Sequence, residues 1–423
     1  MSYLDAQDWS FPVPIAYGPG RLREIAGLCR SAGMARPLIV TDRGSAGLPF
    51  IAELTGHLAG MGAALYADIS PNPRDDEIAA GRALYRSGGH DGIIAIGGGS
   101  GMDGGKAIAL TATNDIDLWD FEYERAAPDM TGKPAFAPLI CIPTTAGTGA
   151  ETASTAMITD TAKMMKWCIW HAELAPAFAL LDPAITTGLP RTLTAWTGAD
   201  AMVHAIEAYC VPDTNPFCDG MALEGLRLVS RWLPVAVAEP ANLEARGAML
   251  TGSCLAGVAF MKGLGLVHAI SHMIGAEYDT QHGLTNAVLL PAVLRFNAPA
   301  IEDRTGPMAQ AMGLADPVVR GVLRAGLRPA GCGRYSPHPA RYRHPGRLRA
   351  PHRGKGAGGQ RGGHQPARAE CFSDRKRHHG CADNRALTPR PIAPPRRARH
   401  RPDRRSRHNS RRSAAPCWGA DPD

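Results

Sequence analysis

The stretch Asp91–Ser100, which reads DGIIAIGGGS, decides the fold of this chain. Its apolar first half predicts a short buried strand over Asp91–Ile96, and three glycines follow at the end of that strand. The next residues, Met102–Leu110, predict a helix. Only glycine lets backbone N–H groups come close to a pyrophosphate, and the N-terminus of a helix attracts anions. Because glycine also serves plain strand-to-helix turns, a nucleotide site and a simple turn both stay open at this point.

The segments on both sides of this stretch alternate between β-branched runs and helical spacing up to about residue 190. Such alternation is typical of a parallel sheet covered by helices. The predicted strands are Pro37–Asp42, Ala63–Asp68 and Leu139–Ile142, and the predicted helices are Leu48–Gly60 and Asp75–Ser87. Beyond Pro190, starting with Thr194–Ala208, long amphipathic stretches continue to about Leu314. We therefore expect a Rossmann-like α/β domain over residues 1–190 and an all-helical domain over residues 191–330.

The composition fits a two-domain protein with a tail of different character. With 423 residues, 44% of them apolar, the chain can bury two sizeable cores. Residues 331–423 hold 23 basic and 6 acidic residues, a net charge of +17, whereas the other 330 residues hold 23 and 33, a net charge of −10. The tail lacks Val and Met and is rich in Arg, Pro, His and Gly. Such a segment cannot bury enough apolar area to fold, so we expect it to be disordered.

Several features favour a cytoplasmic location. The ten cysteines include no CxxC pair, and a chain of this length needs no disulfide bonds, which fits a reducing compartment. The N-terminal residues Met1–Phe11 have no basic start followed by an apolar core, so we expect no secretory signal. The most apolar stretch, Gly252–Ala276, contains Lys262 and two histidines, which predicts buried helices rather than a membrane span.

Polar residues near the glycine turn strengthen the nucleotide interpretation. Asp103 and Lys106 lie in the first turns of the predicted helix, and a hydroxyl-rich loop, Pro143–Gly149 (PTTAGTG), follows another predicted strand. Its hydroxyls and free N–H groups could bind phosphate or ribose. Asp42 ends a third strand, where a carboxylate could accept hydrogen bonds from the adenosine ribose and repel a 2′-phosphate, favouring NAD over NADP. A plain turn-forming aspartate explains this position equally well.

Histidines and one aspartate occur at helical spacing in the second domain. Asp200 and His204 stand four residues apart, so on a helix both side chains leave the same face. His268 and His272 have the same spacing, and His282 follows them. A single such histidine is more often a hydrogen-bonded core residue, but the set together with Asp200 favours a divalent cation such as Fe²⁺ or Zn²⁺. Such an ion could bind an alcohol oxygen and hold its carbon toward a nicotinamide ring for hydride transfer.

Four stretches together resemble the iron-containing (type III) alcohol dehydrogenase family from about Phe11 to about Leu314. They are the glycine turn Gly97–Ser100 with Asp103 and Lys106, the loop PTTAGTGAETAST at Pro143–Thr155, the pair Asp182-Pro183, and the block GLVHAISHMIGAEYDTQHGLTNAVLLP at Gly265–Pro291. The resemblance implies a dinucleotide-binding α/β domain, a helical metal-binding domain, and a cleft between them that holds cofactor and metal. It implies an oxidoreductase that transfers a hydride between an alcohol, or its aldehyde or ketone, and NAD, with NADP the less favoured cofactor.

The resemblance also implies roles for individual residues. The metal ligands would be Asp200, His204, His268 and His282, binding Fe²⁺ or alternatively Zn²⁺. The catalytic residue would be His272, which would lie near the nicotinamide and help to relay the proton of the alcohol. The residues implied in cofactor binding are Asp42, Gly98, Gly99, Ser100, Asp103, Thr144, Thr145, Thr148 and Lys163. The family implies a homodimer or larger homo-oligomer, and a small alcohol or aldehyde substrate that no motif identifies.

The chain departs from the family after about residue 330, where members continue with amphipathic helices. We hypothesise that a frameshift replaced that portion and left the helical domain incomplete, so that exposed apolar surface causes aggregation or weak metal retention. Two alternatives stay open: a relative such as glycerol dehydrogenase or maleylacetate reductase, and an inactive enzyme whose basic tail binds nucleic acid. The intact set of one aspartate and three histidines argues against the metal-free relatives.

Overall fold

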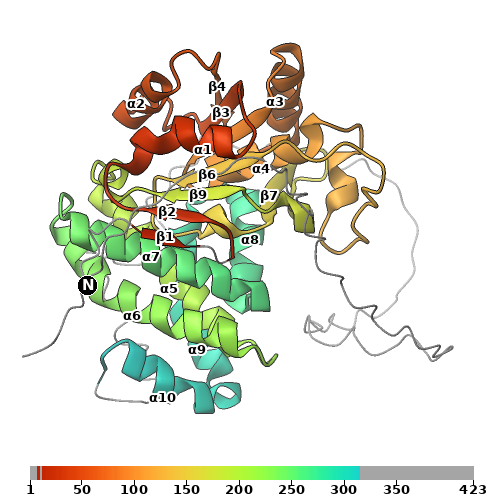
Figure 1. Cartoon of the computed structure of the whole chain (residues 1–423). Coiled ribbons are helices and arrows are strands. Elements are labelled where there is room, and N and C mark those ends of the chain that lie inside the picture. The colour runs from red at the N-terminus through yellow and green to blue at the C-terminus, as the bar shows by residue number, and fades with distance from the viewer. Residues whose placement is uncertain (1–6, 10–11, 315–423) are drawn as a thin grey trace, which may run out of the picture. The chain divides into compact units, whose positions relative to one another are not determined.

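The computed structural model describes residues 7–9 and 12–314 and has a parallel sheet with helices on both faces, followed in the chain by a group of helices (Figure 1). The predicted α/β fold with a helical second part is confirmed. Residues 315–423, which include the end of the predicted helical domain and the predicted disordered tail, lie outside the described residues. What we expect of them, and the domain boundary at residue 190, stay predictions.

The main sheet has seven strands in the order β1-β2-β9-β6-β5-β3-β4. Strands β1 and β2 run antiparallel, and the other neighbours run parallel. The bounds are β1 Gln7–Trp9, β2 Ile15–Tyr17, β3 Pro37–Asp42, β4 Ala64–Ile69, β5 Gly92–Gly97, β6 Leu139–Pro143 and β9 Phe178–Leu181. Strands β5 and β6 are buried along their whole length, as expected for parallel strands covered on both faces.

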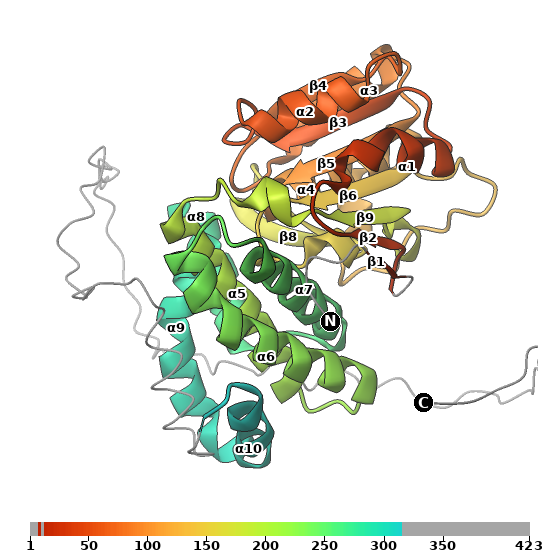
Figure 2. The ribbon, with the colours of Figure 1, turned by 60° about the vertical axis from the view of Figure 1, so that its left-hand side comes forward.

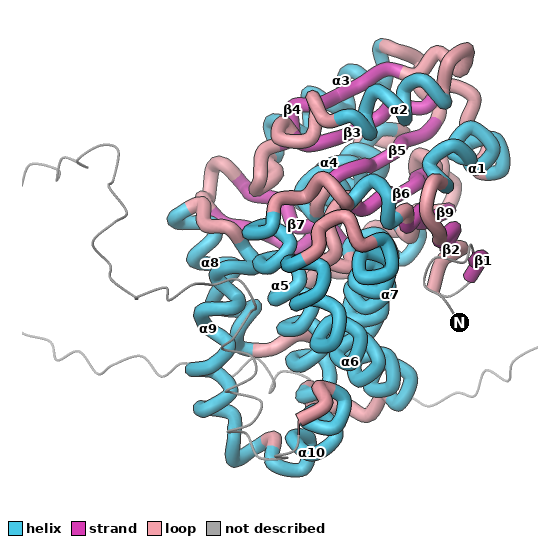
Figure 3. The backbone as a smooth tube through the Cα atoms, turned by 90° about the vertical axis from the view of Figure 1, so that its left-hand side faces the viewer, coloured by secondary structure: helices cyan, strands magenta, loops and turns pink. Residues whose placement is uncertain are grey.

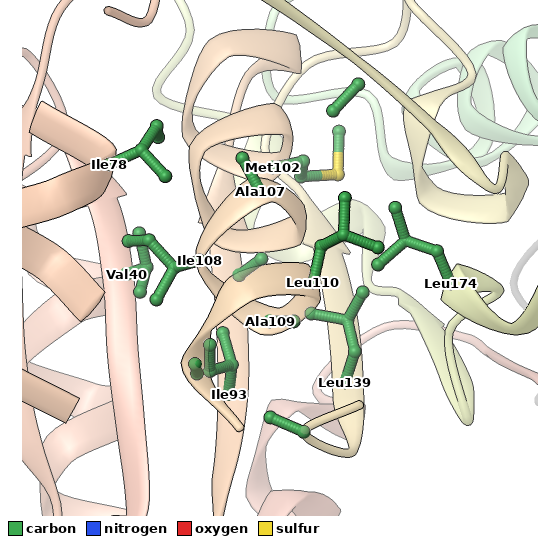
Figure 4. Packing of buried hydrophobic residues seen from close by; sticks show 14 of the residues in the cluster. Val40, Ile78, Ile93, Met102, Ala107, Ile108, Ala109, Leu110, Leu139 and Leu174 are labelled. Atoms are coloured by element: carbon green, nitrogen blue, oxygen red, sulfur yellow. The ribbon is translucent and has the colours of Figure 1, made fainter. Parts of the chain in front are cut away.

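Helices pack on both faces of this sheet. Helices α3 (Asp75–Ser87) and α4 (Gly99–Ala112) share a core with one face, and α1 (Ile25–Ser31) and α2 (Pro49–His57) share a core with the other. Figure 4 shows α4 in the first core, where it projects side chains toward β3 on one side and β6 on the other. Full burial of such a side chain contributes about 1.5–3 kcal/mol, and these contacts fix where the glycine turn at the start of α4 lies.

A separate antiparallel hairpin, which sequence analysis did not predict, lies beside α4. It consists of β7 (Thr155–Asp160) and β8 (Met165–Trp170). Ala156, Ile158 and Ile169 extend the core that contains α4, and β8 also contacts α8. The hairpin therefore connects the glycine-turn helix with the helices that follow the sheet.

The second part of the described chain is helical, and α5 is its central element (Figures 2 and 3). Helix α5 packs against α6, α7 and α9. The bounds are α5 Arg191–Cys210, α6 Pro216–Ala238, α7 Leu243–Ala259, the 3-10 turn η6 Phe260–Lys262, α8 Leu266–Tyr278, α9 His282–Asn297 and α10 Glu302–Ala311. Helix α7 also packs on the sheet edge through Leu250 and Cys254, which share a core with Ile15 and Leu181.

Within residues 7–9 and 12–314, no single helix has the length and apolar character needed to cross a membrane. One bent pair, Leu243–Lys262 with Leu266–Tyr278, meets the requirement by length and composition, and its two arms are bent by 102°.

Candidate active site

Three helices bring Asp200, His204, His268 and His282 together. Asp200 and His204 leave one face of α5, His268 lies in the first turn of α8, and His282 is the first residue of α9. One candidate ligand atom from each residue lies within 4.8 Å of the other three. Asp200 Oδ1 is 3.8 Å from His268 Nε2 and 3.6 Å from His282 Nε2. These separations suit donors that each lie about 2.0–2.2 Å from one shared cation.

Hydrogen bonds set the tautomers of two of the histidines. His204 Nδ1 lies 3.1 Å from the carbonyl oxygen of Gly147, and His268 Nδ1 lies 2.7 Å from Glu207 Oε2. Because a carbonyl and a carboxylate accept hydrogen bonds, each Nδ1 donates, and a neutral imidazole then has its lone pair on Nε2. Both rings therefore present Nε2 as the atom that can bind a metal.

The hydrogen bonds of Asn286 indicate that these residues fit a cation. Its amide nitrogen Nδ2 lies 2.6 Å from Asp200 Oδ1 and 3.1 Å from Nε2 of both His268 and His282. An amide nitrogen carries two hydrogens, so it cannot satisfy three acceptors at once. The buried cluster thus holds more acceptor atoms than this donor can satisfy, and a mixed set of carboxylate and imidazole donors suits a divalent metal ion.

Burial favours the neutral form of the His268, His272 and His282 imidazoles. It lowers the pKa of His268 well below the usual range, and it lowers the pKa of His272 and of His282 to about 3. Neutral imidazole is the form that binds a metal. The His272 ring stands 5.7 Å from the His268 ring and 5.2 Å from the His282 ring, measured between centroids. The histidine predicted to be catalytic therefore lies directly beside two of the four candidate ligands.

The glycine turn and the hydroxyl-rich loop lie at the carboxyl ends of neighbouring parallel strands. Gly97 of β5 pairs with Pro143 of β6, and the Thr144 N–H donates to the Gly97 carbonyl at 2.9 Å. Ligands bind at this edge of such sheets because the loops after the strands converge there. Gly98 precedes α4 without any side-chain hydrogen bond to the first turn, so the N–H groups of that turn suit an anion.

Close contacts bring the other predicted cofactor residues to this edge. A Cβ on Gly99 would lie 2.6 Å from Thr148 Cγ2, and a Cβ on Gly97, whose φ is +150°, would lie 2.7 Å from Asp42 Oδ2. Thr145 Oγ1 is buried and has no hydrogen-bond partner within the described part of the chain. Since a buried hydroxyl without a partner is destabilising, Thr145 fits a polar ligand group at this place.

Two other predicted cofactor residues use their side chains to join neighbouring segments. The Ser100 hydroxyl donates to the Pro71 carbonyl, and Asp103 Oδ2 accepts from the Met157 N–H in β7 at 3.2 Å. Burial raises the pKa of Asp103, and the nearby ammonium of Lys106 opposes that shift. These contacts hold α4 against the loop after β4 and against the hairpin.

One hydrogen bond joins the cofactor edge to the metal cluster. The carbonyl that accepts from His204 belongs to Gly147, inside the hydroxyl-rich loop. A Cβ on Gly147 would lie 2.7 Å from the carbonyl oxygen of Thr197, one turn before Asp200 on α5. The loop that carries Thr144, Thr145 and Thr148 therefore touches the helix that carries two of the four candidate ligands.

The structure does not bring Lys163 to the glycine turn. Lys163 lies in the turn between β7 and β8, where its ammonium pairs with Asp160 at 2.7 Å and lies over the rings of Trp119 and Trp167. Lys166 on β8 is directed differently, because its Nζ donates at 3.2 Å to Asn72 in the loop after β4.

Electrostatics connects Lys166 with both halves of the site. Burial lowers the pKa of Lys166, and Asp103 and Asp200 oppose that shift. Its charge also contributes to the lowered pKa of His272 and of His282. Sequence reasoning chose the lysine of the turn, whereas the lysine three residues later interacts electrostatically with groups in both halves of the site.

Sequence analysis also missed Glu207 and Asn286. Both are buried and contact candidate ligands. The signal was present in the spacing, because Glu207 stands three residues after His204 and Asn286 four residues after His282, each on the same helix face. Polar residues at these spacings are common on solvent-facing helices, so the spacing alone could not identify Glu207 and Asn286 as residues of the site.

A sheet edge of the dinucleotide-binding type joined to one carboxylate and three imidazoles is the arrangement of a metal-dependent dehydrogenase. Two family models match the chain: "Iron-containing alcohol dehydrogenase" over residues 12–183, and "Fe-containing alcohol dehydrogenase family, C-terminal" over residues 194–322. The chain belongs to the iron-containing alcohol dehydrogenase family, which confirms the resemblance drawn from the sequence.

Among curated proteins, the chain is 37% identical over 305 residues to an NAD-dependent methanol dehydrogenase of Bacillus methanolicus, covering 71% of this chain and 79% of that protein. It is 37% identical over 311 residues to a 1,3-propanediol dehydrogenase of Klebsiella pneumoniae, covering 72% and 79%. Among solved structures, it resembles a 1,3-propanediol oxidoreductase, with a TM-score of 0.70, 33% identity, and coverage of 77% of this chain and 85% of that one.

A second solved structure bears on the cofactor. Sulfoacetaldehyde reductase from Bifidobacterium kashiwanohense, solved in complex with NAD⁺, is 30% identical to this chain, with a TM-score of 0.68. The comparison covers 76% of this chain and 85% of that one.

Proposed function

We propose that this protein is a metal-dependent alcohol dehydrogenase that transfers a hydride between a small alcohol and NAD. The observation that carries the proposal is the contact between the two halves of the site. His204 of the metal cluster donates to Gly147 of the loop that lies beside the glycine turn, at 3.1 Å. Metal-bound substrate and nicotinamide would thus meet in one place, as hydride transfer requires.

Asp200, His204, His268 and His282 would hold the metal, with Fe²⁺ as the first candidate and Zn²⁺ as the second. When bound, such an ion supplies Lewis-acid polarisation of an alcohol or carbonyl oxygen. The chain's own contribution is to bring one carboxylate and three imidazoles together, with Asp200, His204 and His268 buried and His282 partly buried. His272, beside His268 and His282, would help to relay the proton of the alcohol.

The cofactor would lie across the glycine turn. The residues proposed to contact it are Asp42, Gly98, Gly99, Ser100, Asp103, Thr144, Thr145, Thr148 and Lys166, the last in place of Lys163. Asp42 supports a preference for NAD, because a carboxylate at the end of β3 would repel a 2′-phosphate. Its oxygens accept from the N–H and the hydroxyl of Ser45 at 3.0 and 2.8 Å, which holds the carboxylate in position.

The substrate class stays open between primary alcohols, diols and hydroxy acids. Relatives carry the names methanol, 1,3-propanediol and 4-hydroxybutyrate dehydrogenase. The test is NAD⁺ reduction by the full-length protein with a panel of these alcohols, after chelation and after addition of Fe²⁺ or Zn²⁺. We expect no activity after chelation and recovery with one of the two metals. Activity that is equal with and without metal would contradict the proposal.

We further propose that a frameshift produced the residues beyond about 315. Helix α9 of the described part supports this with apolar side chains in solvent, since Val288 and Phe296 are 70% and 75% exposed. We expect a helical, dehydrogenase-like continuation in another reading frame of the coding DNA. We also expect aggregation or weak metal retention, and purified protein with full metal occupancy and a cooperative melt would contradict that. Homo-oligomer formation and cytoplasmic location stay predictions.

A further inference from the structure

Glu207 is the buried carboxylate that joins α5 to the start of α8. It stands on α5 and is 6% exposed. Its Oε1 accepts from the Val267 N–H at 2.7 Å, and its Oε2 accepts from the N–H groups of Gly265 and His268 at 3.2 and 3.3 Å. These are the backbone donors at the N-terminus of α8, which have no partners within the helix. Glu207 therefore fixes the position at which α8 begins.

A fourth hydrogen bond distinguishes Glu207 from an ordinary helix cap. The His268 Nδ1–H donates to Oε2 at 2.7 Å, so the same oxygen holds both the backbone and the ring of His268. Gly265 leaves the room for this arrangement, since a Cβ there would lie 2.7 Å from Glu207 Oε1. The carboxylate thus determines the orientation of the ring as well as its tautomer.

Asp182 shows what a buried cap does without such a ring. It is fully buried and accepts from the N–H groups of Gly20, Leu22 and Ala184, each at 2.9 Å. Both carboxylates therefore take three backbone donors, and Glu207 alone of the two takes an imidazole. Asp182 therefore serves as a comparison for the cap without the imidazole.

Glu207 also stands seven residues after Asp200 on α5, so one helix carries a candidate metal ligand and the carboxylate that contacts another candidate ligand. A partner carboxylate of this kind orients a histidine ligand and makes it more basic.

We propose that Glu207 is a positioning residue. Through the Nδ1 hydrogen bond it holds the His268 ring in the orientation and tautomer in which Nε2 can bind the metal. This inference rests on the proposed function, because it assumes that a divalent cation binds at His268. Its consequence is that the metal affinity depends on a side chain that does not itself bind the metal.

The test measures the dissociation constant for Zn²⁺ by titration calorimetry on the full-length, chelated protein, together with the melting temperature of the metal-free form. We expect Glu207→Gln to weaken Zn²⁺ binding by about 10- to 100-fold. The matched control is Asp182→Asn, which removes the charge from a cap of the same kind. It should lower the melting temperature while leaving the Zn²⁺ dissociation constant unchanged.

Gly265→Ala provides a second variant in case Glu207→Gln does not fold, because its methyl group displaces the carboxylate without removing its charge. It should also weaken Zn²⁺ binding. If the wild type binds Zn²⁺ and both variants that fold bind it equally well, Glu207 is only a cap and the inference is wrong. If the wild type binds neither Zn²⁺ nor Fe²⁺, the proposed function and this inference are both overturned.

Discussion

Replacing Gly283 with alanine should weaken metal binding although it replaces none of the proposed ligands. Gly283 follows His282 in the first turn of α9, where that helix meets α5. A Cβ at this position would lie 2.2 Å from the Trp196 carbonyl oxygen and 3.2 Å from Asp200 Cβ. The nearest obstacle is backbone in the middle of α5, so it cannot rotate away, and the start of α9 has to move.

The required movement can be worked out from these distances. Ordinary contact begins at 3.4 Å, so the start of α9 must retreat by about 1.2 Å, the difference between 3.4 and 2.2 Å. Metal–ligand distances tolerate deviations of about 0.2 Å, so His282 can no longer share a cation with Asp200 at relaxed geometry. Overpacking of this kind costs about 1–3 kcal/mol. If metal binding has to overcome that strain, the dissociation constant rises about 5- to 150-fold.

The assay is titration of the chelated protein with Zn²⁺, with Gly275→Ala as the control. Gly275 lies within α8, and a Cβ there has no atom within 4 Å. The control should leave metal affinity unchanged and stabilise the helix by about 0.5–1 kcal/mol. A Gly283→Ala variant with the dissociation constant of the wild type would refute the reasoning, because α9 would then not need to keep its distance from α5 for the metal to bind.

Three further predictions follow from the same geometry. Lys166→Met should raise the KM for NAD⁺, measured by steady-state kinetics, whereas Lys163→Met should leave it unchanged. A higher KM for NAD⁺ in Lys163→Met and an unchanged one in Lys166→Met would contradict this. Asp42→Gly should raise kcat/KM with NADP⁺ relative to NAD⁺, and an unchanged ratio would remove Asp42 from cofactor selection. Burial raises the pKa of Glu151 from 4.5 to about 7, so the folded state favours the protonated carboxyl. The free energy of unfolding therefore falls as pH rises from about 4.5 to about 7. Glu151→Gln should therefore melt higher than the wild type at pH values above about 7, with the gap closing toward pH 4.5, and a gap that does not vary with pH would contradict this.

Short-range patterns in the sequence predicted much of the fold and of the metal cluster. The alternation around Asp91–Ser100 predicted β3, β5 and β6 close to their observed bounds, because buried parallel strands read as apolar runs. The spacing of Asp200 and His204 predicted a shared helix face, because four residues are close to one helical turn. Each of these inferences uses neighbours within about one element, where backbone geometry alone relates the residues.

Tertiary structure decided the contacts between elements. Glu207 meets His268 across 61 residues of chain, and Gly147 meets His204 across 57. The hairpin of β7 and β8 separates the two lysines, since Lys166 stands on β8 and donates to Asn72, while Lys163 stays in the turn with Asp160. Such pairings depend on how helices and strands pack, and packing is fixed by the shape and burial of many side chains at once. A local sequence pattern does not contain these long-range contacts. The sequence by itself therefore determined the main elements and the types of metal ligand, and the packed fold determined which side chains orient the ligands.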